Sequence, residues 1–275
     1  MPEALRFQRL SRLSDHLCYR CQPLAVPGVA GARPLSLYLP PNYFKEAEKP
    51  WPVAVFFDGH NLFDDVDTLA GGWHLHEALA SRHMKGLTVP VVIGIHPGTE
   101  RDSELSPWPL FTGKPGHAIA LMQWFHHTIL PRLKKQLLLH TENMLVGGSS
   151  LGALLALYTV LEEPRRYDKA LMMSPALWPD SFRIFEYVMG HSQLTGKRLY
   201  FDHGQKEDHP ELGDILFQQT GVMADTFALL GLKREQELFW RPDPLGEHNE
   251  ASWARRLPKA LSLIYGDPPT EQAHV

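Results

Sequence analysis

The sequence has little cysteine. Its 275 residues include only Cys18 and Cys21, so a disulfide framework is excluded as the basis of the fold. The two form a C-x-x-C pair in a segment that we interpret as a strand, where positions i and i+3 point to opposite faces. Neither a second ligand pair nor a strand-helix-strand context accompanies them. We therefore expect two reduced thiols rather than a redox motif or half of a zinc site.

The sequence also lacks a long apolar run. No stretch approaches the roughly 18 consecutive apolar residues that would span a bilayer. From Met1 to Arg20, apolar residues alternate with charged or polar ones, which is not the pattern of a signal peptide. We therefore expect no membrane-spanning segment and a cytoplasmic location.

Neither sign of charge dominates. Lys and Arg number 27 and Asp and Glu number 31, which gives a formal net charge of −4. This balance offers no electrostatic basis for binding nucleic acid or an anionic membrane, and we expect neither as a partner. Hydrophobic residues make up 44% of the chain, and its length suffices to bury a core without disulfide or metal staples.

What the sequence does contain is a regular alternation of apolar strands and helices. The runs VAVFFD (53–58) and VPVVIGIH (89–96) are almost entirely apolar, which is typical of strands buried on both faces. The pattern predicts an α/β fold, with a mostly parallel central sheet, helices on both faces and antiparallel strands at the N-terminal edge. The expected strands are 14–22, 34–40, 53–58, 89–96, 143–149, 169–174, 197–204 and 236–241, and the expected helices are 73–84, 117–137, 151–163, 181–190, 210–231 and 250–264.

No linker interrupts this alternation, so we expect one domain over residues 1–275 with a polar tail at 265–275. One long polar connection, 97–116, contains prolines and glycines that break regular structure. Loops at the carboxyl ends of parallel strands build sites, and we expect this loop on the side of the functional site.

The sharpest motif is the G-x-S-x-G string GSSLG (148–152), with Ser150 at its centre. It follows an apolar strand and opens an apolar helix, which is the strand-turn-helix context of a nucleophile elbow. Glycines beside the serine would let the strand and the helix pass closely in a sharp turn. The alternative is a glycine-rich turn in which the serine only caps the helix.

A serine hydroxyl needs a base to take its proton, and fifteen histidines are present. In enzymes built on such an elbow, the chain order is serine, acid, histidine. His248 follows the last expected strand and precedes the last expected helix, and it is our candidate base. His203 and His209 are weaker candidates, because they crowd the position expected for the acid.

The candidate acid lies in the turn that follows the strand 197–204. Glu207 and Asp208 both come shortly after Gly204. Either could accept a hydrogen bond from the imidazole, which would fix its tautomer and stabilise its charged form. Asp202 is not a candidate, because it lies too far inside the strand. We choose Glu207, with Asp208 as the alternative.

An oxyanion hole would complete this set. One donor should be the backbone N–H after the nucleophile, that of Leu151. The other should come from the loop that follows the strand 53–58, where Gly59 permits a tight turn. We assign the second donor to His60, with Asn61 as the alternative. The acidic stretch of this loop does not have the spacing of a calcium loop, and we expect no metal.

Together, these motifs resemble the putative-esterase family of α/β-hydrolases, which includes esterase D (S-formylglutathione hydrolase), enterochelin esterases, and acetylxylan and feruloyl esterases. The resemblance covers about residues 35–264. The chain departs from many relatives at His60, where they have Gln, and at Leu105, where they have Tyr. The matching stretches are VAVFFDGHNLFDD, GGWHLHEAL, VVIGIHPGTERDSELSPW, GGSSLGALLALY, MMSPALW, YFDHGQKED and EHNEASW.

The resemblance implies an α/β-hydrolase fold and a serine carboxylesterase that uses no cofactor and no metal. The implied partner is a small-molecule ester, whose acyl and alcohol groups the resemblance leaves open. Two alternatives are a thioester hydrolase of the S-formylglutathione hydrolase type and a catalytically silent α/β-hydrolase-fold binding protein. The sequence predicts no oligomeric state.

Five further residues are candidates for contact with a substrate. Arg101 and Glu104, on the long loop, could bind a polar or carboxylate-bearing substrate, or could pair with each other to hold the loop. Trp73, Trp108 and Trp178 could form the wall of an acyl or aryl pocket, or could pack a helix or loop against the core.

Overall fold

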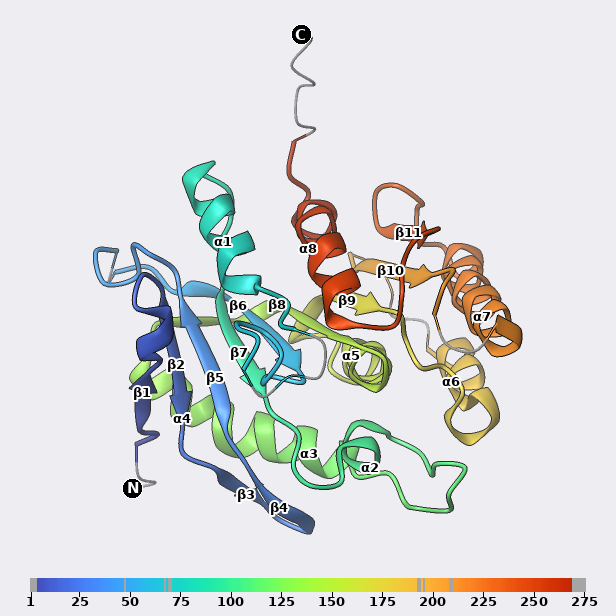
Figure 1. Cartoon of the computed structure of the whole chain (residues 1–275), viewed down its shortest axis with the longest axis horizontal. Helices are drawn as coiled ribbons and strands as arrows, with labels where there is room; N and C mark the ends of the chain where they lie inside the picture. Colours follow the sequence, from blue (N-terminus) through green and yellow to red (C-terminus); the bar gives the residue numbers. More distant parts are fainter. Residues whose placement is uncertain are drawn as a thin grey trace, which may run out of the picture.

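The apolar runs form the centre of a mixed sheet in the computed structural model of the chain (Figure 1). The structure describes residues 4–46, 48–66, 68, 71–191, 194, 196–207 and 210–268. Within these residues, the sheet has nine strands in the spatial order β1-β2-β5-β7-β6-β8-β9-β10-β11. They are β1 (Phe7–Arg9), β2 (Leu17–Cys21), β5 (Leu35–Leu39), β6 (Trp51–Phe57), β7 (Val91–Ile95), β8 (Leu139–Ser149), β9 (Tyr167–Met173), β10 (Arg198–Gly204) and β11 (Leu238–Asp243).

The strand directions confirm the predicted α/β class. From β7 to β11 along this order, neighbouring strands pair in parallel. At the N-terminal edge, β1, β2 and β5 pair antiparallel with their neighbours. Parallel strands need long crossover connections, which here are mostly helices, so the carboxyl ends of β6 to β11 and the loops that follow them gather at one edge of the sheet.

Helices cover both faces of the sheet because its strands are apolar on both sides. Along β6, Val53, Val55 and Phe57 belong to one core, whereas Ala54 and Phe56 belong to the other. The core that contains Ala54 and Phe56 is closed by α1 (Leu75–Met84) and α8 (Glu250–Tyr265), which lie together above the sheet in Figure 1. The core on the opposite face, which contains Val53, Val55 and Phe57, is closed by α3 (Ala118–Trp124), α4 (Leu130–Gln136), α5 (Leu151–Glu162), α6 (Pro179–Met189) and α7 (Pro210–Leu229).

The helix expected over 117–137 is present over residues 118–136, but it is not a regular α-helix throughout. A π-helical turn over Phe125–Ile129 separates α3 from α4, and Pro131 lies in the first turn of α4. Proline has no N–H to donate to the carbonyl four residues earlier, so the regular α-helical ladder cannot run through this position.

Some short elements were not predicted. One is β1. Two others are β3 (Leu24–Val26) and β4 (Val29–Arg33), which lie between β2 and β5 in the sequence and pair with each other as a separate two-stranded sheet. Gly28 makes their turn with a φ of +76°, in the left-handed region that favours glycine. The loop 97–116 contains a helix of five residues, α2 (Arg101–Leu105). Segments this short carry too little periodicity to be recognised from sequence.

The two cysteines are free thiols, as predicted, and both are buried. Cys18 packs in the core beneath α1 and α8, and Cys21 packs in the core on the opposite face of the sheet. Burial raises the pKa of the Cys18 thiol to about 12 and also raises the pKa of Cys21. Because the thiolate is the reactive form, both side chains are poorly reactive in the folded protein.

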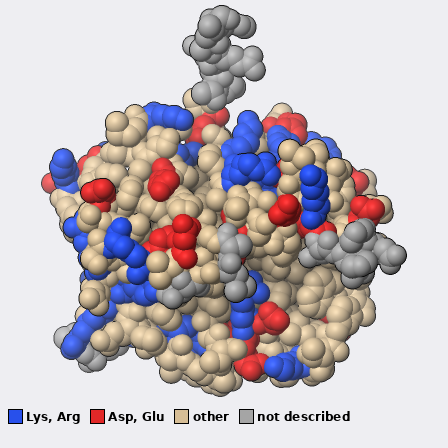
Figure 2. All heavy atoms as spheres, in the orientation of Figure 1, with Lys and Arg blue, Asp and Glu red and all other residues tan. Residues whose placement is uncertain are grey.

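The surface carries both signs of charge. On the face seen in Figure 2, Lys and Arg side chains are intermingled with Asp and Glu side chains. Among the described helices, none is both long enough and apolar enough to cross a membrane.

Candidate active site

Ser150 lies in a sharp turn between β8 and α5. Its backbone has φ of 54° and ψ of −124°, a strained conformation for a residue other than glycine. A Cβ on Gly148 would lie 2.6 Å from the backbone carbonyl carbon of Gly152, so only glycine lets the strand and the helix pass this closely. The Ser150 side chain forms no capping hydrogen bond with α5, so the capping interpretation is wrong. The local geometry is that of a nucleophile elbow.

The neighbouring strand β9 fixes this turn in place. The Ser150 N–H donates to the Met173 carbonyl oxygen at 3.0 Å, and the Ala176 N–H donates to the Ser150 carbonyl oxygen at 3.0 Å. Both backbone polar groups of the serine are therefore hydrogen-bonded by the end of β9 and the segment that follows it. The strained conformation is held by the surrounding structure, as such conformations must be.

His248 lies between β11 and α8, and its ring contacts the predicted acid. Its Nδ1 donates to Glu207 Oε2 at 2.9 Å. The Glu207 side chain is fully buried, whereas 28% of the His248 side chain is exposed. A carboxylate on Nδ1 fixes the tautomer and leaves Nε2 as the basic nitrogen. The imidazole and the Trp253 ring also meet in a T-shaped contact, with 5.1 Å between ring centroids.

The turn that carries Ser150 and the segment that carries His248 lie beside the same cleft, which has a volume of about 300 Å³. Ser150 and His248 both line it, and so do His60 and Asn61 from the loop after β6 and Arg101 from α2. The lining residues thus come from connections at the carboxyl ends of several strands, where sites form in open α/β sheets. The remaining lining residues are Ser149, Asn249, Glu250 and Trp253.

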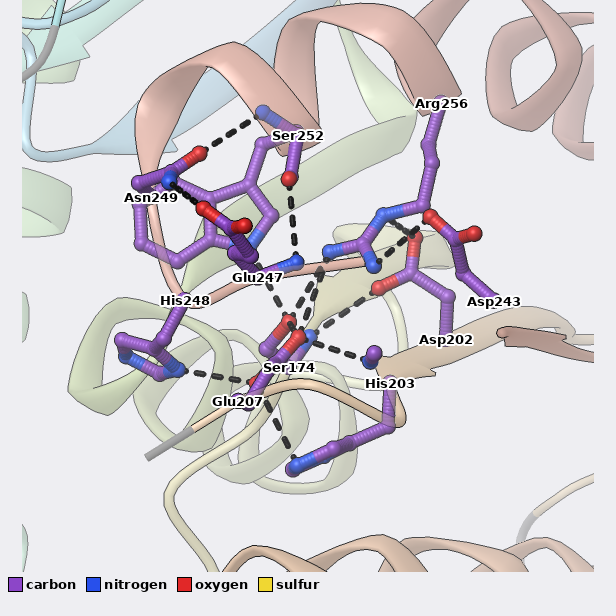
Figure 3. A network of polar contacts seen from close by, with 12 residues as sticks. Ser174, Asp202, His203, Glu207, Asp243, Glu247, His248, Asn249, Ser252 and Arg256 are labelled. Carbon is purple, nitrogen blue, oxygen red and sulfur yellow. Dashed lines mark hydrogen bonds and ion pairs between the residues drawn. The ribbon is translucent and has the colours of Figure 1, made fainter. Parts of the chain in front are cut away.

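Glu207 is kept ionised by its surroundings (Figure 3). Burial acts to raise the pKa of its carboxyl group, but the hydrogen bond from His248, the nearby His203 and the Ser174 hydroxyl lower this pKa to about 2. The Ser174 hydroxyl and the Gly204 N–H both donate to Oε1, at 2.5 and 2.7 Å. Because the pKa is lower in the folded state, the stabilisation is complete above the ordinary value of 4.5 and is lost as the pH falls towards 2.

The weaker candidates for the base and the acid do not join this arrangement in the described part of the chain. His203 is buried, with Nδ1 3.1 Å from Thr220 Oγ1 and Nε2 3.2 Å from Glu207 Oε2, and it does not line the cleft. His203 therefore approaches the acid rather than the serine. Asp208 and His209 lie outside the described residues.

Behind the acid lies a buried network that the sequence did not reveal. Asp202 accepts a hydrogen bond from the Ser174 N–H at 3.1 Å and lies 3.2 Å from Arg256 Nε. Complete burial raises the pKa of Asp202 to about 7, although Arg256 acts to lower it. Arg256 also donates to the Ser174 hydroxyl at 3.0 Å and lies 3.6 Å from Glu207 Oε1. In the sequence, this network could have been suspected only from Arg256, a basic residue on the apolar side of the last helix.

Replacing Arg256 with methionine is expected to lower the free energy of unfolding by about 3–5 kcal/mol, because it removes the cation beside the buried Asp202. Arg255 provides the control. Its side chain is 54% exposed and contacts Asp243, which Arg256 also contacts, so Arg255→Met should cost no more than about 1 kcal/mol. Urea-induced unfolding, at a pH above the pKa of Asp202, measures both variants. Similar losses for the two would contradict the assigned role of Arg256.

The loop after β6 lies across the cleft from the histidine segment. The Asn61 N–H donates to the Asp58 carbonyl oxygen at 2.9 Å, so it is engaged within the loop, which argues against Asn61 as the oxyanion donor. The Leu151 N–H is the first amide of α5 and has no acceptor within the helix. The His60 N–H and the Leu151 N–H are the pair of donors that we carry forward.

Arg101 and Glu104 do not pair with each other. Arg101 holds Asp58 with two hydrogen bonds, from Nε at 2.7 Å and from Nη2 at 2.6 Å, and so braces the loop after β6. Glu104 is fully buried, lies 3.1 Å from Arg33 and accepts the Gly98 N–H at 2.9 Å. The expectation that Glu104 contacts substrate is therefore corrected, because its carboxylate lies in the interior and not on the cleft.

The expected aromatic wall is also corrected, because none of the three tryptophans lines the cleft. Trp73 is buried between Phe56 and Trp253, with centroid distances of 6.0 and 6.1 Å. Trp178 stacks on Phe111 at 5.3 Å. Trp108, the third, packs against two tyrosines. The tryptophan on the cleft is Trp253, whose signal in the sequence was its position five residues after His248.

Across the described part of the chain, no group of three or more His, Cys, Asp or Glu side chains could hold a metal ion.

Comparison with known proteins identifies relatives over most of the chain. The family described as "Putative esterase" matches residues 29–264. A protein of Bacillus subtilis (strain 168) described as "Uncharacterized protein YbbA" is 28% identical over 247 residues, which cover 86% of this chain and 94% of that protein.

Solved structures share the fold at lower identity. A siderophore hydrolase, EstA from Aspergillus nidulans, matches with a TM-score of 0.69 and 16% identity over 96% of this chain and 99% of that one. A ferulic acid esterase matches with a TM-score of 0.69 and 14% identity over 90% of this chain and 97% of that one. These likenesses establish the α/β-hydrolase fold.

Proposed function

The chain belongs to the "Putative esterase" family, and from this premise we propose that it is a serine carboxylesterase that acts through an acyl-enzyme on Ser150. The observation that carries the proposal is the hydrogen bond between His248 Nδ1 and Glu207 Oε2, in a site whose cleft is lined by both His248 and the strained Ser150. This set of groups matches the roles of nucleophile, base and orienting acid.

The first half of the reaction transfers the acyl group to the enzyme. His248 Nε2 takes the proton of the Ser150 hydroxyl as Oγ attacks the ester carbonyl carbon. The backbone N–H groups of Leu151 and His60 stabilise the negative charge that develops on the carbonyl oxygen. The carbon–oxygen bond to the alcohol then breaks, and His248 gives the proton to the departing alkoxide.

The second half regenerates the serine. His248 takes a proton from water, whose oxygen attacks the acyl-enzyme carbonyl, and the same two amides stabilise the second oxyanion. Collapse of this intermediate releases the carboxylic acid, and the proton returns to Ser150 Oγ. Throughout, Glu207 stays ionised and stabilises the imidazolium that forms twice in each turnover, consistent with its lowered pKa of about 2.

A fluorophosphonate probe tests this proposal. It should label the wild-type protein at Ser150, because the probe reacts only with an activated serine. Ser150→Ala should not be labelled. Ser149→Ala is the matched control, because Ser149 also lines the cleft but lies on β8 before the turn, and it should be labelled like the wild type. A folded wild-type protein that is not labelled would instead support a catalytically silent binding protein.

A further inference from the structure

The charged groups of the cleft are not balanced. Four of its lining residues carry ionisable side chains, namely His60, Arg101, His248 and Glu250, and Glu250 is the acidic one. The guanidinium of Arg101 is occupied by the two hydrogen bonds to Asp58 and by a contact to Asp102 at 3.3 Å. His248 faces the carboxylate of Glu207. Arg101 and His248 therefore already have anionic partners within the protein.

Glu250 is the exception. It is the first residue of α8, only 8% of its surface is exposed, and its carboxylate takes part in no ion pair with a described residue. Its contact within the described part of the chain is with Asn61, whose Nδ2 donates to Oε1 at 2.9 Å. Its position in the first turn of α8 is one where acidic side chains interact favourably with the helix dipole.

Asn61 adds a second unmet acceptor. It is 7% exposed and lines the same cleft, and its Oδ1 has no hydrogen-bond partner among the described residues. The amide cannot turn over to remedy this, because Nδ2 is the atom that donates to Glu250. A buried acceptor without a donor costs free energy.

We propose that Glu250, held by Asn61, is a specificity-determining residue that selects esters carrying a hydrogen-bond donor, either a protonated amine or a hydroxyl group, beside the scissile bond. The inference rests on the proposed esterase function and goes beyond it by naming the substrate class. Glu250 and Asn61 lie next to the groups assigned to the reaction, because Asn61 follows His60 and Glu250 follows His248 by two residues. A donor bound there would therefore belong to a part of the substrate close to the ester.

The same arrangement argues against an anionic substrate. An incoming carboxylate would meet the unpaired charge of Glu250, and the charge of Arg101 is already shared between the carboxylates of Asp58 and Asp102. A cationic or hydroxylated group supplies the donor that Glu250 lacks without displacing any interaction. Hydrogen bonds to an ionised acceptor are the stronger kind, so this contact can discriminate between substrates.

Matched pairs of acetate esters test the proposal. The acetate of dimethylaminoethanol, protonated near neutral pH, is compared with isopentyl acetate, its uncharged carbon isostere. Glycol monoacetate is compared with propyl acetate, which replaces the hydroxyl by a methyl group. We expect kcat/KM to favour the donor-bearing member of at least one pair by about tenfold or more. Preference in the first pair identifies an ammonium substrate, and preference in the second identifies a hydroxylated one.

Variants then connect the preference to the residue. Glu250→Gln keeps an acceptor for Asn61 and removes the charge, so it should lower the kcat/KM ratio of whichever pair shows the preference by about tenfold. Glu247→Gln is the matched control, because it removes the same charge three residues away on an exposed side chain that does not line the cleft. It should leave the ratio unchanged.

The outcomes separate this inference from the function beneath it. If no ester is hydrolysed and the fluorophosphonate probe does not react, the esterase proposal itself fails. If the neutral esters are hydrolysed but both pairs give ratios near one, only the specificity inference is overturned. It is likewise overturned if a preference exists but Glu250→Gln leaves it intact, or if Glu247→Gln changes it equally.

Discussion

Replacing Ser150 with alanine is expected to lower kcat/KM for an activated short-chain ester by about 10⁴- to 10⁶-fold, because the proposed mechanism then has no nucleophile. The residual rate would come from substrate binding and from the amides of Leu151 and His60. Hydrolysis of a p-nitrophenyl ester, followed at a fixed pH above neutrality, measures the effect. Alanine keeps the backbone of the elbow, so the fold should be retained.

Two further measurements make this result interpretable. Circular dichroism should show that the alanine variant is folded. Ser149→Ala, which also removes a hydroxyl group from the cleft lining, should change the rate far less. Near-full activity of folded Ser150→Ala would show that another group is the nucleophile and would end the proposed mechanism.

Replacing Glu207 with glutamine is expected to lower kcat by about 10⁴-fold, as for the equivalent change in a serine protease triad. An amide N–H turned towards His248 would favour the tautomer that has its proton on Nε2, and that nitrogen could no longer take the proton of Ser150. The loss of the carboxylate would also remove the charge that stabilises the imidazolium. Single-turnover release of p-nitrophenol measures the chemical step.

Asp208→Asn is the control for this prediction, since the sequence leaves Asp208 as the alternative acid. We expect it to retain most of the wild-type kcat. The pH profile adds a further check: Glu207, whose pKa of about 2 keeps it ionised, should contribute no transition to the activity near neutral pH. Loss of activity in Asp208→Asn, with Glu207→Gln active, would reverse the assignment of the acid.

Sequence patterns were sufficient to propose the candidate residues whose positions follow from the order of strands and helices. Ser150 could be found because an elbow needs a strand, a sharp turn and a helix in succession. His248 and Glu207 could be proposed because the carboxyl ends of successive parallel strands meet at one edge of the sheet. The contact between them joins residues 41 positions apart, and topology alone brings those positions together.

Side-chain partners across loops were not predictable in the same way. Arg101 and Glu104 are three residues apart and were candidates for pairing with each other, yet one contacts Asp58 and the other Arg33. Which carboxylate an arginine reaches depends on how two loops pack, and no periodic pattern records this. Trp73 failed as a wall residue for a related reason: a tryptophan at the start of a helix fits a cleft and a core equally well by sequence.

The concentration of site residues around the start of α8 has a consequence for how activity is acquired. His248, Asn249, Glu250, Trp253 and Arg256 lie within nine positions of one another. The turn bearing Ser150 is completed about one hundred residues earlier. During synthesis on the ribosome, the sheet and the elbow can assemble while the polypeptide is still inert. The proposed hydrolysis would therefore begin only when α8 leaves the ribosome and packs against the sheet.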